Sequence, residues 1–244
     1  MKLRMHTISV LMKKDIKLLL TNKNVLLMLF LPIMFAILYQ FIYADMMIEE
    51  PETRGFVISI ATLINIVATP LNGFAMMIAE EKEKSTLRVL MLSDVSGLEY
   101  LISKLLVVLI VMESIGVIIF LVTQVEIQGL LPYLFVTTIT SITLLLFGAV
   151  IGLISKDQIS TGTLSSPIMI LFLLPPMLGQ FNQLLHSIAQ FVPTYGLSEL
   201  LNLIVEGQSI FVMDMLGNYA LIVAWIFIGV MVFCMMYRKR RFDN

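Results

Sequence analysis

Six long runs of apolar residues constrain this chain more than any other feature of its sequence. They cover residues 25–44, 56–79, 105–123, 131–154, 167–187 and 218–237. A helix needs about 20 residues to cross the hydrocarbon core of a bilayer, so each run is long enough to span it. Charged residues make up 14% of the 244 residues, compared with about 25% in soluble domains. The sequence therefore predicts an all-α membrane protein, with one six-span domain over 1–244.

The basic residues are concentrated in alternate connecting segments. Of the 16 Lys and Arg residues, 15 lie in the segments 1–24, 80–104, 155–166 and 238–244. The intervening loops hold Arg54 and several acids, and no Lys or Arg is expected inside a span. Because Lys and Arg favour the cytoplasmic side of a membrane, both termini of this multi-pass chain are expected in the cytoplasm.

Residues 1–24 are expected to form an amphipathic helix on an anionic lipid leaflet. On a helical wheel the apolar side chains share one sector and the lysines lie opposite, as for Ile8, Leu11, Met12, Ile16 and Leu19 against Lys13, Lys14 and Lys17. That pattern is typical of interfacial helices. Asp15 falls inside the apolar sector, and two interpretations stay open: a hydrogen-bonded residue at its edge, or a docking contact to a partner.

Several chemical functions lack the residues that they need. None of the 13 glycines is followed by Lys, so the phosphate-binding loop GxxxxGK[ST] is absent and ATP binding by this chain is not expected. One cysteine, Cys234, and two distant histidines provide no zinc-ligand spacing. We expect no catalytic residue, metal or cofactor on the chain. A net charge of −1 does not indicate nucleic-acid binding.

One segment resembles an enzyme motif. The sequence EEPETR (49–54) matches the EExxxR pattern of CAAX-type intramembrane proteases. Those enzymes carry the acids on a helix within the membrane and need downstream histidines, whereas here Pro51 interrupts the motif and His186 is the one downstream histidine. An acidic outer loop is the favoured interpretation.

Glu113 is the most costly residue to place in a membrane. It lies about ten residues into the third span, where an unpaired carboxylate costs several kcal/mol. It is expected to face the protein interior, a water-filled cavity or a subunit interface. Two roles stay open: a group in a transport path, or an interhelical hydrogen bond to Asn65, Asn72 or a Ser or Thr hydroxyl.

The loop 80–104, EEKEKSTLRVLMLSDVSGLEYLISK, predicts a short amphipathic helix at the cytoplasmic surface. Ser85 or Thr86 is a suitable cap, and Leu87, Leu90 and Met91 share one face. The loop has nothing of its own to cover that face, so the pattern favours a partner protein, with a helix lying among lipid headgroups as the alternative.

A second short helix is predicted on the outer side. Residues 188–217 are too polar for a span and too apolar for a free loop. After Pro193, apolar residues recur at a spacing of three to four, at Leu197, Leu200, Leu201 and Ile204. We expect a re-entrant helix that dips into the outer leaflet. The pair Pro175–Pro176 is expected to kink or break the fifth span.

These features together resemble the type-2 ATP-binding-cassette permeases. The loop between their second and third spans follows the approximate pattern E-[KR]-E-x-G-T-L-x-x-L-x-x-x-P-[VI]-S, and this chain has EKEKSTLRVLMLSDVS. Ser85 replaces the usual Gly and Asp94 the usual Pro. The basic N-terminal segment, the six spans and FVPTYGLSELLNLIVEG after the fifth span extend the resemblance over the whole chain.

The resemblance implies a partner and a mechanism. Such permeases dimerise, with a second copy or a homologous permease, and each half docks a cytoplasmic ATPase that holds ATP and Mg. The coupling helix would lie at about 84–93, and the second and fifth spans would line the path. The residues expected to couple to the ATPase are Glu81, Lys84, Ser85, Thr86, Leu87, Arg88, Leu90, Met91 and Ser93.

The sequence predicts an exporter subunit in a bacterial cell membrane. The spans carry little fixed charge, which favours an amphiphilic peptide or drug as substrate over ions or sugar polymers. In size and plan the chain resembles exporters of phenol-soluble modulins and bacteriocin-immunity permeases. A membrane sensor or assembly protein without an ATPase partner is the alternative, and an intramembrane protease is a remote third.

Overall fold

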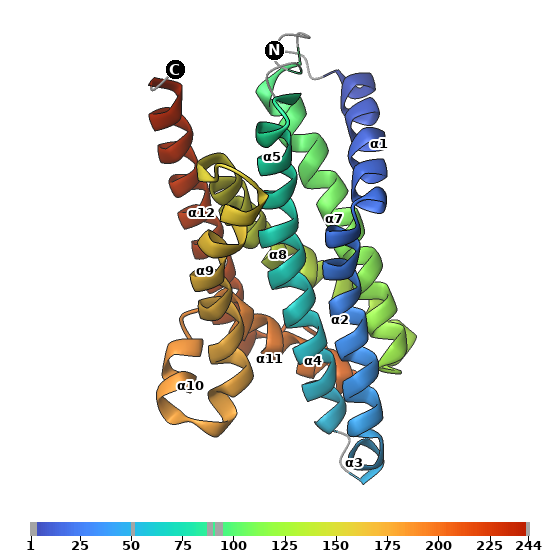
Figure 1. Ribbon diagram of the computed structural model, residues 1–244. Helices are drawn as coiled ribbons and strands as arrows, with labels where there is room; N and C mark the ends of the chain where they lie inside the picture. The colour runs from blue at the N-terminus through green and yellow to red at the C-terminus, as the bar shows by residue number, and fades with distance from the viewer. Residues whose placement is uncertain (1–3, 50–51, 87–89, 91–94, 243–244) are drawn as a thin grey trace.

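The computed structural model describes residues 4–49, 52–86, 90 and 95–242, and this part of the chain is helical without strands (Figure 1). The longer helices lie along one bundle axis. The elements are α1 (Met5–Thr21), α2 (Lys23–Ile42), α3 (Ala44–Glu49), α4 (Glu52–Val67), η1 (Ala68–Gly73), α5 (Phe74–Glu83), α7 (Gly97–Val122), η2 (Ile127–Gly129), α8 (Leu130–Ile154), α9 (Gln158–Leu178), η3 (Gly179–Phe181), α10 (Gln183–Ala189), α11 (Pro193–Val205), η4 (Met213–Met215) and α12 (Leu216–Phe242).

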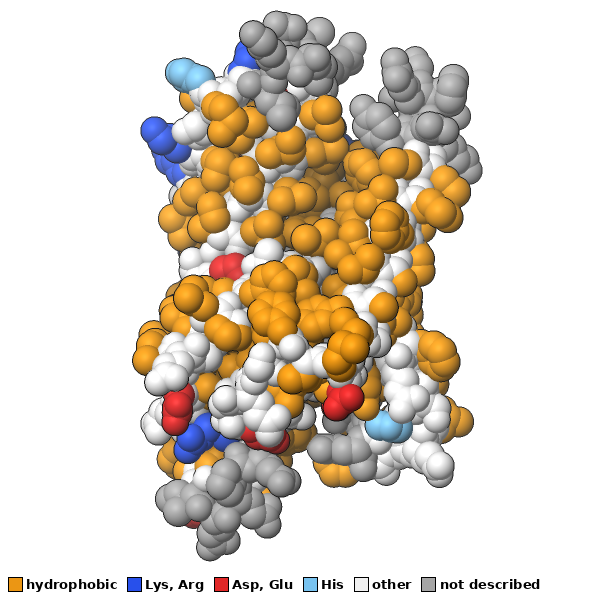
Figure 2. Space-filling view, turned by 180° about the vertical axis from the view of Figure 1, so that it is seen from behind, with side chains coloured by type: hydrophobic (Ala, Val, Ile, Leu, Met, Phe, Trp, Pro, Cys, Tyr) orange, Lys and Arg blue, Asp and Glu red, His pale blue; other side chains and the backbone are white. Residues whose placement is uncertain are grey.

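Six helical segments within the described residues are long and apolar enough to cross a membrane. They are Val25–Ile42, Thr53–Glu83, Gly97–Val122, Ile127–Ile154, Gln158–Leu178 and Met213–Met236. Hydrophobic side chains cover most of one face of the molecule, and charged side chains gather mainly toward its two ends (Figure 2). Since α1 and the last turns of α12 lie at the same end of the bundle (Figure 1), the topology agrees with an even number of spans.

Two spans begin earlier than their hydropathy suggests. The third begins at Gly97 rather than 105, because Ser96 and Glu99 form a capping box that starts the helix in polar sequence. The fifth covers Gln158–Leu178 rather than 167–187. Asp157 caps it through Ser160, and small hydroxyl side chains donate to carbonyls of their own helix, as Thr161 does to Gln158. The polar residues 158–166 are therefore helical, and α9 ends two residues after Pro176.

The apolar sector of α1 is covered by protein rather than by lipid, which corrects the expectation for residues 1–24. Ile8, Leu11 and Leu19 are buried, and α1 packs along α7 (Figure 1). The early start of α7 explains the difference, because it adds two helical turns that supply a surface for α1. Lysines on the opposite side of α1, such as Lys13 and Lys17, remain exposed.

The second span is the central helix of the bundle. It continues from α4 through the π-helical turn η1 into α5, and other helices bury most of it. Pro70 lies in this turn, where its missing N–H favours a wider helix. Gly148 on α8 permits close contact there, since a Cβ atom at that position would lie 2.7 Å from the Pro70 carbonyl oxygen. Gly152 lies one turn further along the same face and packs on Ile78.

At the opposite end, α10 and α11 form a pair bent by 95°. The helix predicted after Pro193 is α11, which starts at that proline and buries Leu197, Leu200, Leu201 and Ile204. It packs against α4, α8 and α12, so it closes this end of the bundle. Thr194 donates a hydrogen bond to the Phe172 carbonyl of α9 over 2.6 Å, which attaches the start of α11 to α9.

Candidate coupling and transport sites

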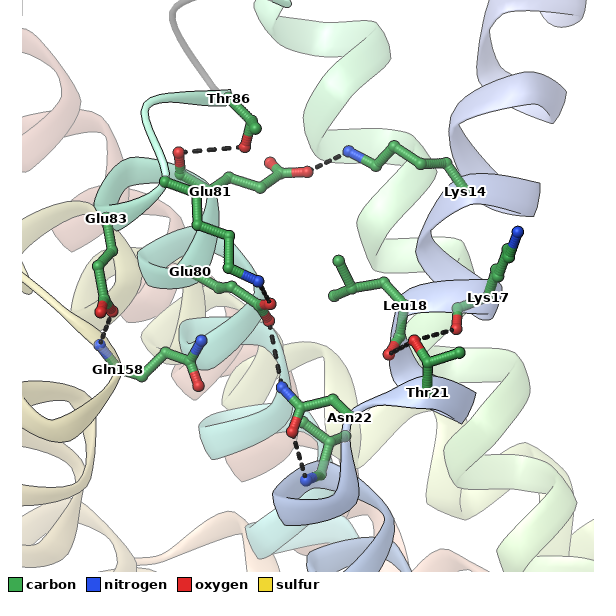
Figure 3. A network of polar contacts seen from close by, with 12 residues as sticks. Lys14, Lys17, Leu18, Thr21, Asn22, Glu80, Glu81, Glu83, Thr86 and Gln158 are labelled. Carbon is green, nitrogen blue, oxygen red and sulfur yellow. Dashed lines mark hydrogen bonds and ion pairs between the residues drawn. The ribbon is translucent and has the colours of Figure 1, made fainter.

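The last turn of α5 leads into the loop expected to dock a partner, and it is held on several sides by polar contacts (Figure 3). Five charged residues in a row, Glu80 to Lys84, form this turn and its cap. A run of charged residues on a helix normally faces water, yet Glu80 and Glu81 are buried. Glu81 pairs with lysines of α1 and α7, and Glu80 contacts Asn22 at the end of α1 as well as Lys84 of its own turn, so this turn is joined to other helices rather than free at the surface.

Three buried charged residues, Asp15, Glu81 and Lys104, and the partly exposed Lys14 form a cluster that joins α1, α5 and α7. The Lys104 ammonium on α7 lies 3.2 Å from Asp15 on α1 and 3.1 Å from Glu81 on α5. Lys14 contacts both carboxylates, Glu81 and Asp15. Burial opposes the charge of Lys14, but the contacts with Glu81 and Asp15 outweigh it and raise the pKa of Lys14. The two buried carboxylates are thus balanced by the buried Lys104 and by the partly exposed Lys14, as the burial of charged groups requires.

The position of Lys104 corrects the expectation that no Lys or Arg lies inside a span. Its side chain is 1% exposed within the span Gly97–Val122. The Tyr100 ring adds a cation–π contact, with its centroid 5.0 Å from the ammonium. Asp15 accepts a hydrogen bond from Lys104 within the protein, which agrees with the interpretation of a hydrogen-bonded residue. Because Asp15 is buried, its carboxylate is not accessible to a partner protein.

The other side of α5 is bound to the connection between α8 and α9. The Lys82 ammonium donates to the carbonyls at the end of α8, at 2.9 Å for Leu153 and 3.3 Å for Gly152, and to the carbonyl of its C-cap Ser155. A cation at a helix C-terminus is stabilised by the helix dipole. Glu83 accepts a hydrogen bond from the Gln158 amide at the start of α9 over 3.2 Å (Figure 3). The turn therefore contacts four other helices.

The far side of the loop is anchored as well. The Glu99 carboxylate accepts the backbone and side-chain N–H groups of Arg4, at 2.8 to 3.1 Å, and the Ser96 amide at 3.0 Å. Ser96 is the N-cap of α7. The two ends of the loop 84–96 are thus attached to the same helix, α1.

The predicted coupling residues divide into two groups. Glu81 is buried in the charged cluster, so its side chain is not on a docking surface. Lys84, Ser85 and Thr86 are exposed: Lys84 pairs with Glu80 across one turn, and Thr86 donates to the Glu81 carbonyl. Leu90 has a helical conformation, and its side chain is half-buried. The predictions for Leu87, Arg88, Met91 and Ser93 fall outside the described residues.

Ser85 adopts the left-handed conformation, with φ of 57°. It follows Lys84, the C-cap of α5, where a helix often ends with a left-handed residue that favours Gly. This is the position at which the permease pattern has Gly. The backbone therefore ends α5 as that pattern implies, although with a serine.

Glu113 forms interhelical hydrogen bonds. Its carboxylate accepts the hydroxyls of Thr137 at 3.0 Å and Thr138 at 2.8 Å, both on α8. Two donors on one neighbouring helix reduce the cost of this group in the bilayer. The arrangement agrees with the interpretation of a hydrogen bond to a Ser or Thr.

Asn65 lies on α4 just before the π-helical turn, Asn72 lies within that turn, and the two contact different helices. Asn65 donates to the Met112 carbonyl of α7 over 3.0 Å and accepts from Thr69 over 3.1 Å. Asn72 donates to the Met169 sulfur and accepts the Ser165 hydroxyl, both on α9. Within the described residues neither asparagine forms a hydrogen bond with Glu113, so the three polar residues stabilise three separate helix contacts.

A cleft of about 940 Å³ opens at the end opposite to the charged cluster. It lies between α4 on one side and α9, α10 and α11 on the other, and Tyr43, just before α3, and Met46, in α3, also line it. It brings the second and fifth spans together around one space. Polar and aromatic side chains of α4 and α11 line it, including Ser59, Tyr195 and Glu199, together with Glu206, the C-cap of α11.

Sequence reasoning missed the pair Gly148–Gly152 and the burial of Lys104. The glycines form the pattern GxxxG, which marks close helix contacts in membranes and was a usable signal. Lys104 carried no such signal, because a lysine at the edge of an apolar run normally reaches water.

Comparison with known families agrees with this architecture. The model described as ABC-2 family transporter protein matches residues 49–236, which include every span after the first. No individually curated protein matches the sequence. Members of this family are the membrane-spanning components of ABC transporters, which work with an ABC ATPase and are typically not catalytic themselves. The chain is therefore a multi-pass membrane protein that belongs to the ABC-2 transporter family.

Proposed function

We propose that this chain is the transmembrane subunit of an exporter that dimerises and docks a separate cytoplasmic ATPase. ATP and Mg are held by the ATPase, and the substrate is an amphiphilic peptide or drug. The termini and the loop 80–104 face the cytoplasm of a bacterial cell. The second half of the assembly is a second copy or a homologous permease.

The observation that carries the proposal is the junction at the end of α5. A docking loop transmits force only if its ends are fixed to the spans that must move. Here the loop leaves from a turn bound to α1, α7, α8 and α9, and it returns to α7 at a cap that Arg4 holds. A push on the loop would therefore move several spans together. Lys84, Ser85 and Thr86 supply the exposed surface at its start.

Site-specific photo-crosslinking tests the proposal. A photoreactive amino acid at Thr86, which is exposed, is activated in native membranes and the adducts are identified by mass spectrometry. We expect a partner chain that contains GxxxxGK[ST]. The matched control is Ile127, which is exposed at the opposite end and should not capture that chain. If Thr86 yields only lipid or self-adducts, the docking role is wrong and a sensor or assembly protein becomes the better explanation.

A further inference from the structure

The cleft at the outer end has the size and lining of a ligand site. Its volume of about 940 Å³ lies at the upper end of the range of about 300–1,000 Å³ that is usual for small-molecule sites. Aromatic rings and thioethers provide most of its apolar lining, from Tyr43, Met46, Phe56, Met177, Phe181 and Tyr195. Such surfaces can bind the hydrophobic parts of amphiphiles that differ in shape.

One face of α11 is turned toward this cleft. Tyr195, Glu199, Asn202 and Glu206 recur every three to four residues and all line it. The opposite face of the helix carries the leucines buried against the bundle. The helix thus separates an apolar side, which fixes it in place, from a polar side that lines the cleft.

The Asp, Glu, Lys and Arg residues among the described lining residues are all acidic. Two carboxylates, Glu199 and Glu206, are among the lining residues, and none of the described lining residues is Lys or Arg. His186 is the remaining side chain there that can carry a positive charge, and its ring lies edge-on to Tyr195 with 5.6 Å between centroids. Carboxylates beside aromatic faces attract a cation twice, by charge and by cation–π contact.

A second observation also indicates a ligand. Ser59 on α4 lines the cleft and is 7% exposed, yet its hydroxyl has no hydrogen-bond partner among the described residues. Most serines within helices of this protein donate to a carbonyl of their own helix, as Ser103 does. A buried hydroxyl without a partner is unusual, so Ser59 is available to a polar group that enters the cleft.

We propose that this cleft binds the cationic head and apolar body of an amphiphile, with Glu199 and Glu206 selecting the positive charge. The inference rests on the proposed export function and narrows its substrate class. The same chemistry is present in a transported cationic compound and in a membrane lipid with an ammonium headgroup, and the test distinguishes these two sources.

A matched pair of probes tests the charge preference directly. Tetraphenylphosphonium and tetraphenylborate have nearly the same shape and opposite charge. The full chain in nanodiscs of diglucosyl diacylglycerol, a neutral lipid without an ammonium group, should bind the phosphonium saturably above empty nanodiscs, and the borate should show no such excess. The double variant Glu199→Gln, Glu206→Gln should bind the phosphonium about tenfold more weakly. Ser59→Val should weaken it less, and Glu126→Gln, an acid at the same end outside the cleft, should leave it unchanged.

Two further measurements keep the test decisive. In the double variant, excess binding of tetraphenylborate should appear, a gain that a misfolded cleft would not produce. Competition of the phosphonium by phosphatidylethanolamine in the nanodiscs would identify a membrane lipid as the natural ligand, and lack of competition a free amphiphile. Equal binding of both probes, or unchanged phosphonium binding in the double variant, would overturn the proposal. Because the ATPase is absent from this assay, such a failure is separate from a failure of the Thr86 crosslink.

Discussion

The Lys104 ammonium on α7 lies 3.2 Å from the Asp15 carboxylate on α1, and each residue is 1% exposed. The two residues are 89 positions apart in sequence. Their contact attaches the N-terminal helix to the third span beside the turn from which the docking loop leaves. A buried ion pair of this kind contributes little net stability compared with apolar residues, but it makes the arrangement depend on each partner.

Removal of one partner should therefore destabilise the fold. Lys104→Met leaves Asp15 and Glu81 in a buried site with Lys14 as their remaining cation, and we expect a loss of about 3–5 kcal/mol of unfolding free energy. The measurement is unfolding of the purified chain in detergent. Lys17→Met, on the exposed side of α1, is the control and should have little effect. Adding Asp15→Leu to Lys104→Met removes the unpaired charge and should restore most of the loss; no recovery would argue against the pairing.

The same cluster predicts a pH dependence at the alkaline side. The contacts with Glu81 and Asp15 raise the pKa of Lys14 above its ordinary value of 10.5, despite the opposing effect of burial. The protonated form is thus favoured by folding, and its contribution to stability is fully present below pH 10.5. It is lost as the pH rises through the higher pKa of the folded state. Lys14→Arg keeps the charge and should lose less stability above pH 10.5 than the wild type, whereas Lys17→Arg should not differ from it.

Glu113 offers a test of a structural role within the spans. In a double-mutant cycle, Glu113→Leu and Thr138→Val should show a coupling of about 0.6–1.7 kcal/mol, the range found for hydrogen bonds between membrane helices. Ser114→Ala is the control, since the Ser114 hydroxyl is exposed and donates to its own helix at Ile110. Glu113→Gln keeps an acceptor for Thr138 and should fold and transport normally. A changed substrate range in that variant would instead place Glu113 in the transport path.

Because the helices are in close contact at the π-helical turn, replacement by Ala should affect stability very differently at two glycines. A Cβ atom on Gly148 would lie 2.7 Å and 2.8 Å from the carbonyl oxygens of Pro70 and Leu71, which are backbone atoms that cannot rotate away. Gly148→Ala should cost about 1–3 kcal/mol of unfolding free energy. Gly162 on α9 has no atom within 4 Å of such a Cβ, so Gly162→Ala should be neutral or stabilising by up to about 1 kcal/mol. Equal effects at both sites would contradict the packing.

Local patterns in the sequence predicted helices well. The spacing of Leu197, Leu200 and Leu201 after Pro193 predicted a short helix, and α11 begins at that proline with these side chains buried. The apolar sector of α1 was also identified, because Ile8, Leu11 and Leu19 are the residues that the helix buries. Helical periodicity is a property of one segment, so it is visible without the rest of the fold.

What covers each face could not be predicted in the same way. Hydropathy gives the same value to a face against lipid and a face against protein, so α1 was expected on a leaflet and packs on α7 instead. The charged cluster includes one contact between residues 67 positions apart and another between residues 89 positions apart, and no local pattern indicates such pairings. The outer cleft likewise combines α4 with α9 to α11, whose approach only the folded chain reveals.

Ser85 gives the last prediction, because its strain lies where the docking loop begins. A non-glycine residue in the left-handed region costs about 1–2 kcal/mol, and φ at Ser85 is 57°. Ser85→Gly should therefore stabilise the end of α5, whereas Ser85→Val, which is branched at Cβ, should disfavour it. If the loop docks an ATPase, crosslinking from Thr86 should be kept in the glycine variant and reduced in the valine variant. Gln124, with φ of 55° at the opposite end, provides the control: Gln124→Val should lower stability to a similar extent without changing the Thr86 crosslink. Equal crosslinking in both Ser85 variants would show that the geometry of this turn does not matter for docking.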